Sequence, residues 1–454
     1  MTSTRYQNGC AGGSKAHGEA PPWFEGGRVV VGFNNGNVNN NNDNNRAFAR
    51  AVRVSGEYQG AGKTLFHELY DAYLDARRGK KPSLNKLAFE THWADNLLDL
   101  ERRIAAGTWE PSPYTCFVAT RPKAREIHAP DFGDRVAHHW LVGKVQPGYE
   151  RIFIEDSYAN RPGKGCHAAV QRARQFIRQV HSGQGGGFYL QLDIANFFYS
   201  IPRKKLWQML KAGMERDGVP MEAQRFMHAL LRRSAVESGV HYRSTPAQRA
   251  LVPHHKQLAN ASPGRGLPIG NLPSQFLANV YMHSFDLFVK HILKAKRYIR
   301  YVDDFVLFHH DRAQLERWLV EIERFLAAEL GLSLKADIRL RPLTDGLDFL
   351  GYVIYPTHSR VRRRVVAHAR AAFDEWGKAH VRGNCLAATP EELRKIRNQA
   401  ASFDGHFCHA NSFRLRVGLH QRFPWLHEAS LNRRFHLSQE RRPLRIRLHG
   451  AQHA

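Results

Sequence analysis

Two adjacent aspartates interrupt an apolar stretch of the chain, and few folds tolerate such an arrangement. Residues 297–308 read RYIRYVDDFVLF, which predicts a hairpin of two apolar strands joined at Asp303 and Asp304. Two like charges at one turn repel each other, and burying either carboxylate without a partner costs free energy. The sequence therefore predicts a cation beside this turn.

A third aspartate ends another apolar strand earlier in the chain. Residues 186–194 read GGFYLQLDI, which predicts a buried strand that carries Asp193 near its end. Mg²⁺ prefers oxygen ligands and is often held by one or two carboxylates together with substrate phosphates. Asp193, Asp303 and Asp304 on neighbouring strands are therefore expected to bind two Mg²⁺ ions for in-line phosphoryl transfer. The alternative is a solvated Asp-Asp turn and a helix-capping aspartate.

The charge of the chain favours a polyanionic partner. Lys and Arg number 67 against 41 Asp and Glu, which gives a formal net charge of +26. Nucleic acid is the default partner for such an excess. No run approaches the ~18–20 apolar residues of a membrane span, so no membrane partner is expected. Five scattered cysteines predict a reducing, cytoplasmic location.

Several segments follow one another in the order of a known motif series. QLDIANFFYSI, GLPIGNLPSQFLANVYMHSFD, YVDDF and FLGY resemble successive motifs of reverse transcriptases. Upstream, REIHAPDFGDRVAHHW and EDSYANRPGKGCHAAV resemble the fingers motifs of prokaryotic members. The resemblance covers residues 110–355 and, more loosely, residues 365–430. YVDDF alone would be only suggestive, whereas the ordered set is specific.

This resemblance implies an α+β fold of the right-hand polymerase type. Its parts would be fingers, a palm with an antiparallel sheet and helices, and a helical thumb. The implied activity is RNA-directed DNA polymerisation, with template RNA, primer, cDNA and dNTPs as partners. Asp193, Asp303 and Asp304 would be the catalytic, metal-binding triad.

The resemblance also assigns residues to the incoming nucleotide. Arg125 would grip the triphosphate, with Lys123 or Arg121 assisting, which suits bidentate guanidinium–phosphate geometry. Phe198 would stack under the sugar and exclude a ribose 2′-hydroxyl. The alternative for Phe198 is an ordinary core aromatic, because the neighbouring Phe197 and Tyr199 are equally aromatic.

Two further assignments concern the primer and the leaving group. The FLGY segment, composed of Phe349, Leu350, Gly351 and Tyr352, resembles the primer grip. In related enzymes a lysine that follows the helix after the aspartate hairpin is proposed to protonate pyrophosphate. Here that region reads LSLKADIRL, so Lys335 and Arg339 are both candidates for the general acid.

The segment at residues 269–275, IGNLPSQ, narrows the resemblance. It is similar to the signature of reverse transcriptases of diversity-generating retroelements, of prokaryotic or phage origin. Those enzymes copy a template-repeat RNA with errors at template adenines, and act with a basic accessory variability protein. Gln275 would face the nascent base pair; the alternative is a helix-surface amide. A defence-associated or group II intron-like enzyme, or a non-catalytic RNA-binding protein, remains the alternative function.

An asparagine-rich segment near the N-terminus supports the same subtype. Residues 32–53 read GFNNGNVNNNNDNNRAFARAVR, and asparagine codons are adenine-rich. Our hypothesis is that residues 28–54 are a template repeat translated in frame with the polymerase. A low-complexity linker and a vestigial ligand-binding domain are the alternatives.

The chain is expected to have five parts. They are a disordered Asn-rich leader at 1–54, a helical extension at 55–110, fingers and palm at 111–355, a helical thumb at 356–430 and a basic tail at 431–454. The segment at residues 235–265 is rich in Ser, Pro and basic residues, which predicts a long loop or an insertion. The 26 histidines lack cysteine partners at zinc-finger spacing, which favours ordinary surface or core histidines.

Overall fold

The computed structural model describes residues 63–120, 123–183, 186–383 and 385–426, and the backbone of 24–25, 28–29, 184 and 444–447. The chain divides into two units, Met1–Gly56 and Glu57–Ala454. In the first unit the described part is an antiparallel pair, β1 (Phe24–Glu25) and β2 (Arg28–Val29). The rest of the predicted leader lies outside the described residues.

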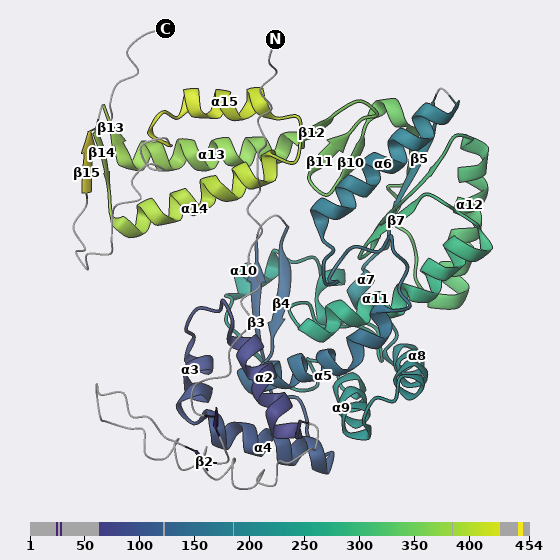
Figure 1. Ribbon diagram of the computed structural model, residues 1–454, viewed down its shortest axis with the longest axis vertical. Helices are drawn as coiled ribbons and strands as arrows, with labels where there is room; N and C mark the ends of the chain where they lie inside the picture. The colour runs from purple at the N-terminus through teal and green to yellow at the C-terminus, as the bar shows by residue number, and fades with distance from the viewer. Residues whose placement is uncertain are drawn as a thin grey trace. The chain divides into compact units, whose positions relative to one another are not determined.

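Three helices form the predicted helical extension. They are α2 (Leu65–Arg77), α3 (Leu84–Thr91) and α4 (Trp93–Ala106). Gly107 ends α4 in the left-handed region at φ 70°, which glycine adopts without strain. The buried faces of α2 and α4 pack against α5 (Phe132–Glu150), as Figure 1 shows. The helical periodicity of the sequence is confirmed here.

The fingers contain a three-stranded sheet in the order β4-β3-β6. Its strands are β3 (Tyr114–Ala119), β4 (Arg125–Ala129) and β6 (Val240–Tyr242). The predicted loop at residues 235–265 is wrong in part, because it contains β6, α10 (Pro246–Ala250) and the short turns η1 (His254–Lys256) and η2 (Leu258–Asn260). A three-residue edge strand carries no alternating apolar pattern, so the sequence did not reveal it.

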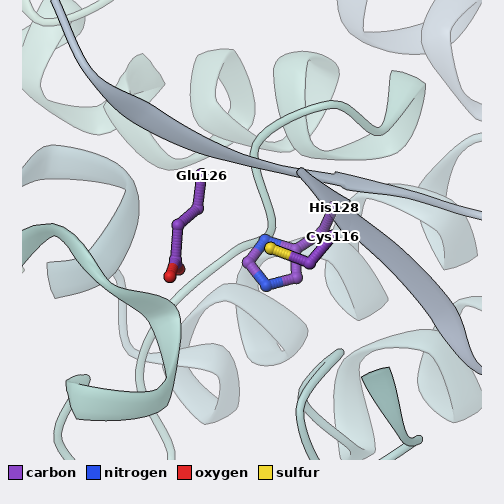
Figure 2. Close-up of side chains that lie close together, drawn as sticks. All are labelled: Cys116, Glu126 and His128. Carbon is purple, nitrogen blue, oxygen red and sulfur yellow. The ribbon is translucent and has the colours of Figure 1, made fainter. Parts of the chain in front are cut away.

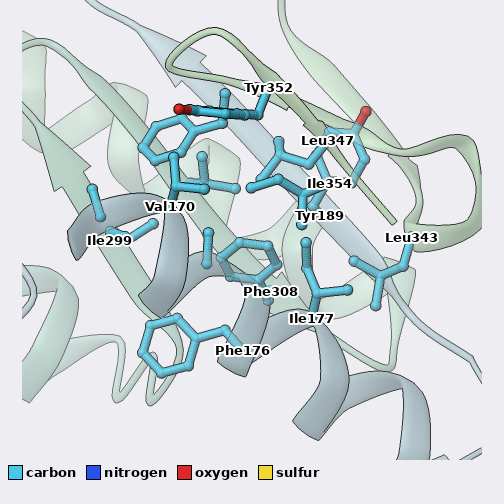
Figure 3. Packing of buried hydrophobic residues seen from close by; sticks show 14 of the residues in the cluster. Val170, Phe176, Ile177, Tyr189, Ile299, Phe308, Leu343, Leu347, Tyr352 and Ile354 are labelled. Carbon is cyan, nitrogen blue, oxygen red and sulfur yellow. The ribbon is translucent and has the colours of Figure 1, made fainter. Parts of the chain in front are cut away.

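The palm is built on an antiparallel sheet in the order β7-β8-β5-β9. Its strands are β5 (Phe188–Asp193), β7 (Tyr298–Tyr301), β8 (Asp304–His309) and β9 (Arg339–Pro342). Helix α6 (Cys166–Gln184) covers one face, where Phe176 and Ile177 meet Tyr189 and Phe308 (Figure 3). On the other face, Phe305 packs against Phe285 with ring centroids 5.0 Å apart.

Helices and a second hairpin complete the palm. The helices are α7 (Phe197–Ser200), α8 (Arg203–Arg216), α9 (Met221–Arg232), α11 (Leu272–Leu287) with the π-helix η3 (Phe288–Ile292), and α12 (Arg312–Phe325) with the π-helix η4 (Leu326–Leu330). After the turn η5 (Leu343–Asp345) comes an antiparallel sheet of β10 (Leu347–Phe349), β11 (Tyr352–Ile354) and β12 (Ser359–Val361).

The C-terminal region is mainly helical. It contains α13 (Arg363–His380), α14 (Pro390–Phe407), α15 (Phe413–Arg422) and a small sheet of β13 (Val381–Arg382), β14 (Cys385–Ala388) and β15 (Leu444–Arg447). Thr389 and Glu392 form the capping box that starts α14. Apart from β15, which pairs with β14, the predicted basic tail lies outside the described residues.

These elements confirm the predicted α+β fold of the right-hand polymerase type, with an antiparallel palm sheet and a helical thumb. The five predicted part boundaries stay predictions. Among the described residues, no helix is long and apolar enough to cross a membrane.

Candidate active site

Asp193 and Asp304 stand opposite each other at the end of the palm sheet. The antiparallel register of β5 and β8 pairs these two residues directly. Successive strand residues point to opposite faces, so Tyr189, Gln191 and Asp193 share the face that α6 covers. Strand pairing therefore brings together two carboxylates that lie far apart in the sequence.

Asp303 lies in the turn that joins β7 to β8. The predicted turn at Asp303 and Asp304 is displaced by one residue, because Asp304 begins β8 opposite Tyr301 and the turn is formed by Val302 and Asp303. A one-residue slip would reverse every side chain of β8, so the buried apolar residues of that strand set the register. Val302 takes φ 60°, which is strained for a β-branched residue.

A buried arginine holds this strained turn. Arg300 has no exposed surface, and its Nη1 donates to the Val302 carbonyl oxygen at 3.0 Å. Its Nη2 lies 2.6 Å from the Asp286 carboxylate of α11. Its Nε donates to Asp286 Oδ1 at 2.8 Å, and Asn279 and Ser157 each accept a further hydrogen bond at 3.1 Å. Sequence patterns alone do not reveal this network, although a charged residue inside the strand YIRY is a signal for it.

The carboxylates differ in their surroundings. Burial raises the pKa of Asp303 to about 6, and the negative charge of Asp193 adds to the effect. Burial also raises the pKa of Asp304 to about 7, although the hydrogen bond from Gln191 opposes it. The amide Nε2 of Gln191 donates to Asp304 Oδ1 at 3.2 Å. Positive charge nearby would favour the ionised carboxylates.

Lys335 supplies one such charge. Its Nζ lies 2.5 Å from Asp193 Oδ2, and its backbone N–H donates to the Asp193 carbonyl at 2.8 Å. Arg339, the other candidate general acid, instead pairs with Asp337 through Nε at 3.2 Å from Oδ1. Lys335 is therefore the candidate that contacts the aspartate group.

The site suits a divalent cation in its chemistry. Asp193 Oδ1 is buried and has no hydrogen-bond partner among the described residues, and all three candidate ligands are carboxylates. The three aspartates are nevertheless more widely spaced than a closed metal cluster. In the described chain, the set of three donors within 4.8 Å of one another is Cys116, Glu126 and His128 on the fingers sheet.

An open cavity of about 610 Å³ is lined by Asp193 and Asp304, whereas Asp303 is not part of its wall. Fingers, palm and the start of α13 all contribute charged residues to its wall. These residues are Lys123, Asp193, Lys256, Asp304, Lys335, Asp337, Arg339, Asp348, Arg362 and Arg364. Of the predicted triphosphate ligands, Lys123 lines this cavity, whereas Arg125 is exposed at the start of β4 and is not part of its wall. Arg121 lies outside the described residues.

The loop before α11 packs tightly on the fingers. Gly270 has φ 114°, and an added Cβ would lie 2.8 Å from Ile127 Cγ2. The carbonyl of Ile269 accepts from the His128 N–H at 2.8 Å. Gln275 is exposed on α11, while its neighbours Ser274 and Phe276 are buried.

The remaining predicted residues have mixed positions. Phe198 is half-buried in α7, and its ring lies 5.4 Å from that of Phe197. Phe349 and Tyr352 are fully buried, so their side chains belong to the core. Leu350 and Gly351 form the turn between β10 and β11, at φ 49° and 94°. Within the predicted primer grip, the turn is therefore the part that can reach a ligand.

A palm sheet with paired aspartates, a fingers sheet and thumb helices define the fold of the right-hand polymerases. Residues 120–354 match the family model "Reverse transcriptase (RNA-dependent DNA polymerase)". That match covers more than half of the chain, so the chain belongs to the reverse transcriptase family.

Two curated relatives are intron proteins. The chain is 27% identical over 160 residues to an uncharacterized 91 kDa protein in the cob intron of Schizosaccharomyces pombe, covering 35% of this chain and 16% of that protein. It is 23% identical over 186 residues to the group II intron-encoded protein LtrA of Lactococcus lactis subsp. cremoris. That alignment covers 40% of this chain and 26% of LtrA. The chain thus spans about a quarter or less of these relatives.

Two solved structures of telomerase are also similar. Telomerase from Candida albicans in complex with a fragment of telomeric RNA matches with a TM-score of 0.37 and 9% identity, over 74% of this chain and 62% of that chain. Apo telomerase from Candida tropicalis, truncated from its C-terminal domain, matches with a TM-score of 0.40 and 9% identity, over 60% of each chain.

Proposed function

We propose that the protein is an RNA-directed DNA polymerase that extends a primer on an RNA template with dNTPs, using Mg²⁺. The observation that carries this proposal is the pairing of Asp193 with Asp304 across β5 and β8, with Asp303 on the adjoining turn. Membership of the reverse transcriptase family supports it. The all-carboxylate ligand set supports Mg²⁺ as the cation.

The residues of the cavity have separate roles in this reaction. Two divalent ions bound by Asp193, Asp303 and Asp304 would activate the primer 3′-hydroxyl and neutralise charge on the triphosphate. Lys335 is the proposed general acid, because its ammonium reaches the aspartate group and has a proton to give to pyrophosphate. Lys123 and Lys256 add positive charge for the phosphates from the fingers side.

The start of the thumb is suited to a nucleic-acid backbone. Arg363, Arg364 and Arg370 are exposed on α13 and make no ion pair within the described chain. Arg364 also lines the cavity over the aspartates. Lysine and arginine contacts to phosphate position a duplex without reading its sequence. The formal net charge of +26 fits a template–primer duplex as the polyanion.

For the subtype, we propose a diversity-generating retroelement enzyme. It would copy a template-repeat RNA with errors at adenines, together with a basic accessory variability protein, for targeted gene diversification. Two features support this: the IGNLPSQ segment with its exposed Gln275, and the Asn-rich residues 28–54, which lie almost entirely outside the described residues. A prokaryotic or phage origin and a cytoplasmic location belong to the same proposal.

A group II intron-like function is the second candidate. The specific observation in its favour is the similarity to LtrA and to the S. pombe intron protein. An accurate intron enzyme is not expected to need an adenine-rich template segment, so fidelity separates the two candidates.

The test is primer extension on a defined RNA template, followed by sequencing of the cDNA. The retroelement proposal predicts misincorporation concentrated opposite adenine, and a changed error spectrum in Gln275→Pro. Accurate cDNA from the wild-type protein would reject the retroelement subtype and favour the intron-like candidate. No extension under any condition would reject the polymerase proposal itself. The genomic DNA next to the gene supplies an independent check, because a near-copy of codons 28–54 that differs at adenines is expected.

A further inference from the structure

Three buried side chains with different donor atoms converge on the fingers sheet (Figure 2). Cys116 in β3 stands opposite His128 in β4, and Glu126 shares the face of His128 because strand side chains alternate. One ligand atom from each lies within 4.8 Å of the others. Cys116, Glu126 and His128 are 0%, 6% and 2% exposed.

The cluster has more polar groups than partners. The Cys116 thiol and the His128 ring make no hydrogen bond within the described chain, whereas Glu126 Oε2 accepts from the Leu258 N–H at 3.0 Å. Burial raises the pKa of Cys116 to about 11 and lowers that of His128 to about 4. Burying three polar groups with so few partners costs free energy, and a shared cation would offset that cost.

The donor set selects the kind of cation. Mg²⁺ takes oxygen ligands and octahedral geometry, so a thiol and an imidazole do not suit it. Zn²⁺ takes sulfur, nitrogen and carboxylate oxygen in tetrahedral geometry. Arg249 is the cationic side chain whose charge acts on Cys116 and Glu126, and it already stacks over Tyr242 at 4.4 Å.

We propose that Cys116, Glu126 and His128 bind one Zn²⁺ ion that clips β3 to β4, with water as the fourth ligand. Binding replaces the thiol proton with the metal, so one proton leaves Cys116 while His128 binds in its neutral form. The site lies on the fingers sheet and is separate from the palm aspartates. It goes beyond the proposed polymerase activity and does not depend on it.

The position of the clip suggests its structural effect. The β3–β4 hairpin pairs Ala119 with Arg125 above the cluster, and the segment between these strands carries Lys123. On the other side of the cluster, Glu126 Oε2 accepts a hydrogen bond from the Leu258 N–H, and the backbone N–H of His128 donates to the Ile269 carbonyl. Zinc would therefore stabilise the connection between the fingers hairpin and the loop that leads into α11.

The test measures metal in the full-length protein. After purification without added metal and dialysis against a chelator, zinc is added back and its stoichiometry is measured by mass spectrometry. We expect one Zn²⁺ per chain, a zinc-dependent rise in melting temperature, and a thiolate-to-cobalt absorption band when Co²⁺ is used instead. In Cys116→Ala and His128→Gln we expect zinc binding weaker by at least about tenfold, comparable to disruption of a metal site.

Two controls separate this site from others. Cys408→Ala removes an exposed cysteine and should keep the cobalt band. Asp303→Asn should keep the full zinc content although it loses polymerisation. A failure of the polymerase proposal is therefore distinguishable from a failure of the zinc proposal. Circular dichroism checks that the cluster variants fold. Absence of Zn²⁺ and Co²⁺ binding in the folded wild-type protein, or binding retained in both cluster variants as an adventitious ion only, would overturn the proposal.

Discussion

Arg300 reaches past its own strand and donates to the carbonyl of Val302 at 3.0 Å, from a position with no exposed surface. The same guanidinium pairs with Asp286 on α11, so the turn that carries Asp303 is tied to the helix behind the sheet. A residue with a strained backbone keeps that conformation only where surrounding contacts stabilise it. The hydrogen bond from Arg300 is such a contact for Val302.

The first prediction concerns this contact. Arg300→Met leaves Asp286 buried without its cationic partner and with the Tyr298 hydroxyl as a donor, which is expected to cost about 3–5 kcal/mol of unfolding free energy. The double variant Arg300→Met/Asp286→Leu should recover much of that stability, because no buried charge is left unpaired. Primer extension should stay low in the single and in the double variant, because both lack the Arg300 hydrogen bond to the Val302 carbonyl. Full activity in the stable double variant would show that Arg300 does not position the turn.

The second prediction separates the two candidate general acids. Lys335→Ala should slow nucleotide incorporation by about 10²–10⁴-fold, the usual contribution of a positioned acid. Arg339→Ala should have a much smaller effect, because Arg339 pairs with Asp337 instead of Asp193. Single-turnover incorporation of one dNTP measures both. A larger loss of incorporation rate in Arg339→Ala than in Lys335→Ala would assign the general acid to Arg339 instead of Lys335.

The third prediction tests the packing of the loop before α11. Gly270→Ala meets Ile127 and the His128 carbonyl in addition to an unfavourable φ, so we expect about 2–4 kcal/mol of destabilisation. Gly264→Ala is the matched control, because Gly264 has φ 73° but open space around an added Cβ. It should cost about 1 kcal/mol from backbone strain alone. If urea denaturation shows the same loss of unfolding free energy for Gly270→Ala and Gly264→Ala, the close contact at Gly270 does not contribute to stability.

The fourth prediction concerns the pH dependence of stability. His138 is fully buried, neither ring nitrogen has a hydrogen-bond partner within the described chain, and burial lowers its pKa to about 3. Below about pH 6.5 the unfolded chain binds a proton that the folded chain refuses, so stability falls as pH falls. This single group contributes up to about 1.4 kcal/mol per pH unit.

His138→Leu should remove that slope between pH 6 and pH 4, as measured by denaturation at each pH. His255→Leu is the control, because His255 is exposed, and it should leave the wild-type slope unchanged. Parallel pH curves for the wild-type protein and His138→Leu would contradict the prediction.

Local patterns reveal some residues of the site and hide others. Asp193, Asp303 and Asp304 can be found from sequence because each lies at or beside the end of an apolar strand, where an acid is costly. Lys335 and Arg339 cannot be separated that way, since only β9 pairing and the ion pair with Asp337 distinguish them. The one-residue displacement of the turn depends on the register of β8 with β5, which is set by packing in three dimensions.

The metal cluster was missed for a related reason. Zinc ligands are usually recognised by short cysteine and histidine spacing, whereas Cys116 meets Glu126 and His128 only through strand pairing. The Arg300 network likewise joins a strand to a distant helix. Both depend on contacts between segments whose pairing the sequence pattern alone does not specify.

The most direct test of the active site is primer extension on an RNA template with Mg²⁺, comparing wild type with Asp304→Asn. Asp95→Asn is the matched control, because Asp95 is exposed on α4 in the N-terminal extension. We predict extension by wild type and Asp95→Asn, and a loss of at least about 10³-fold in Asp304→Asn. Undiminished extension by a folded Asp304→Asn variant would contradict the assignment of the palm aspartates.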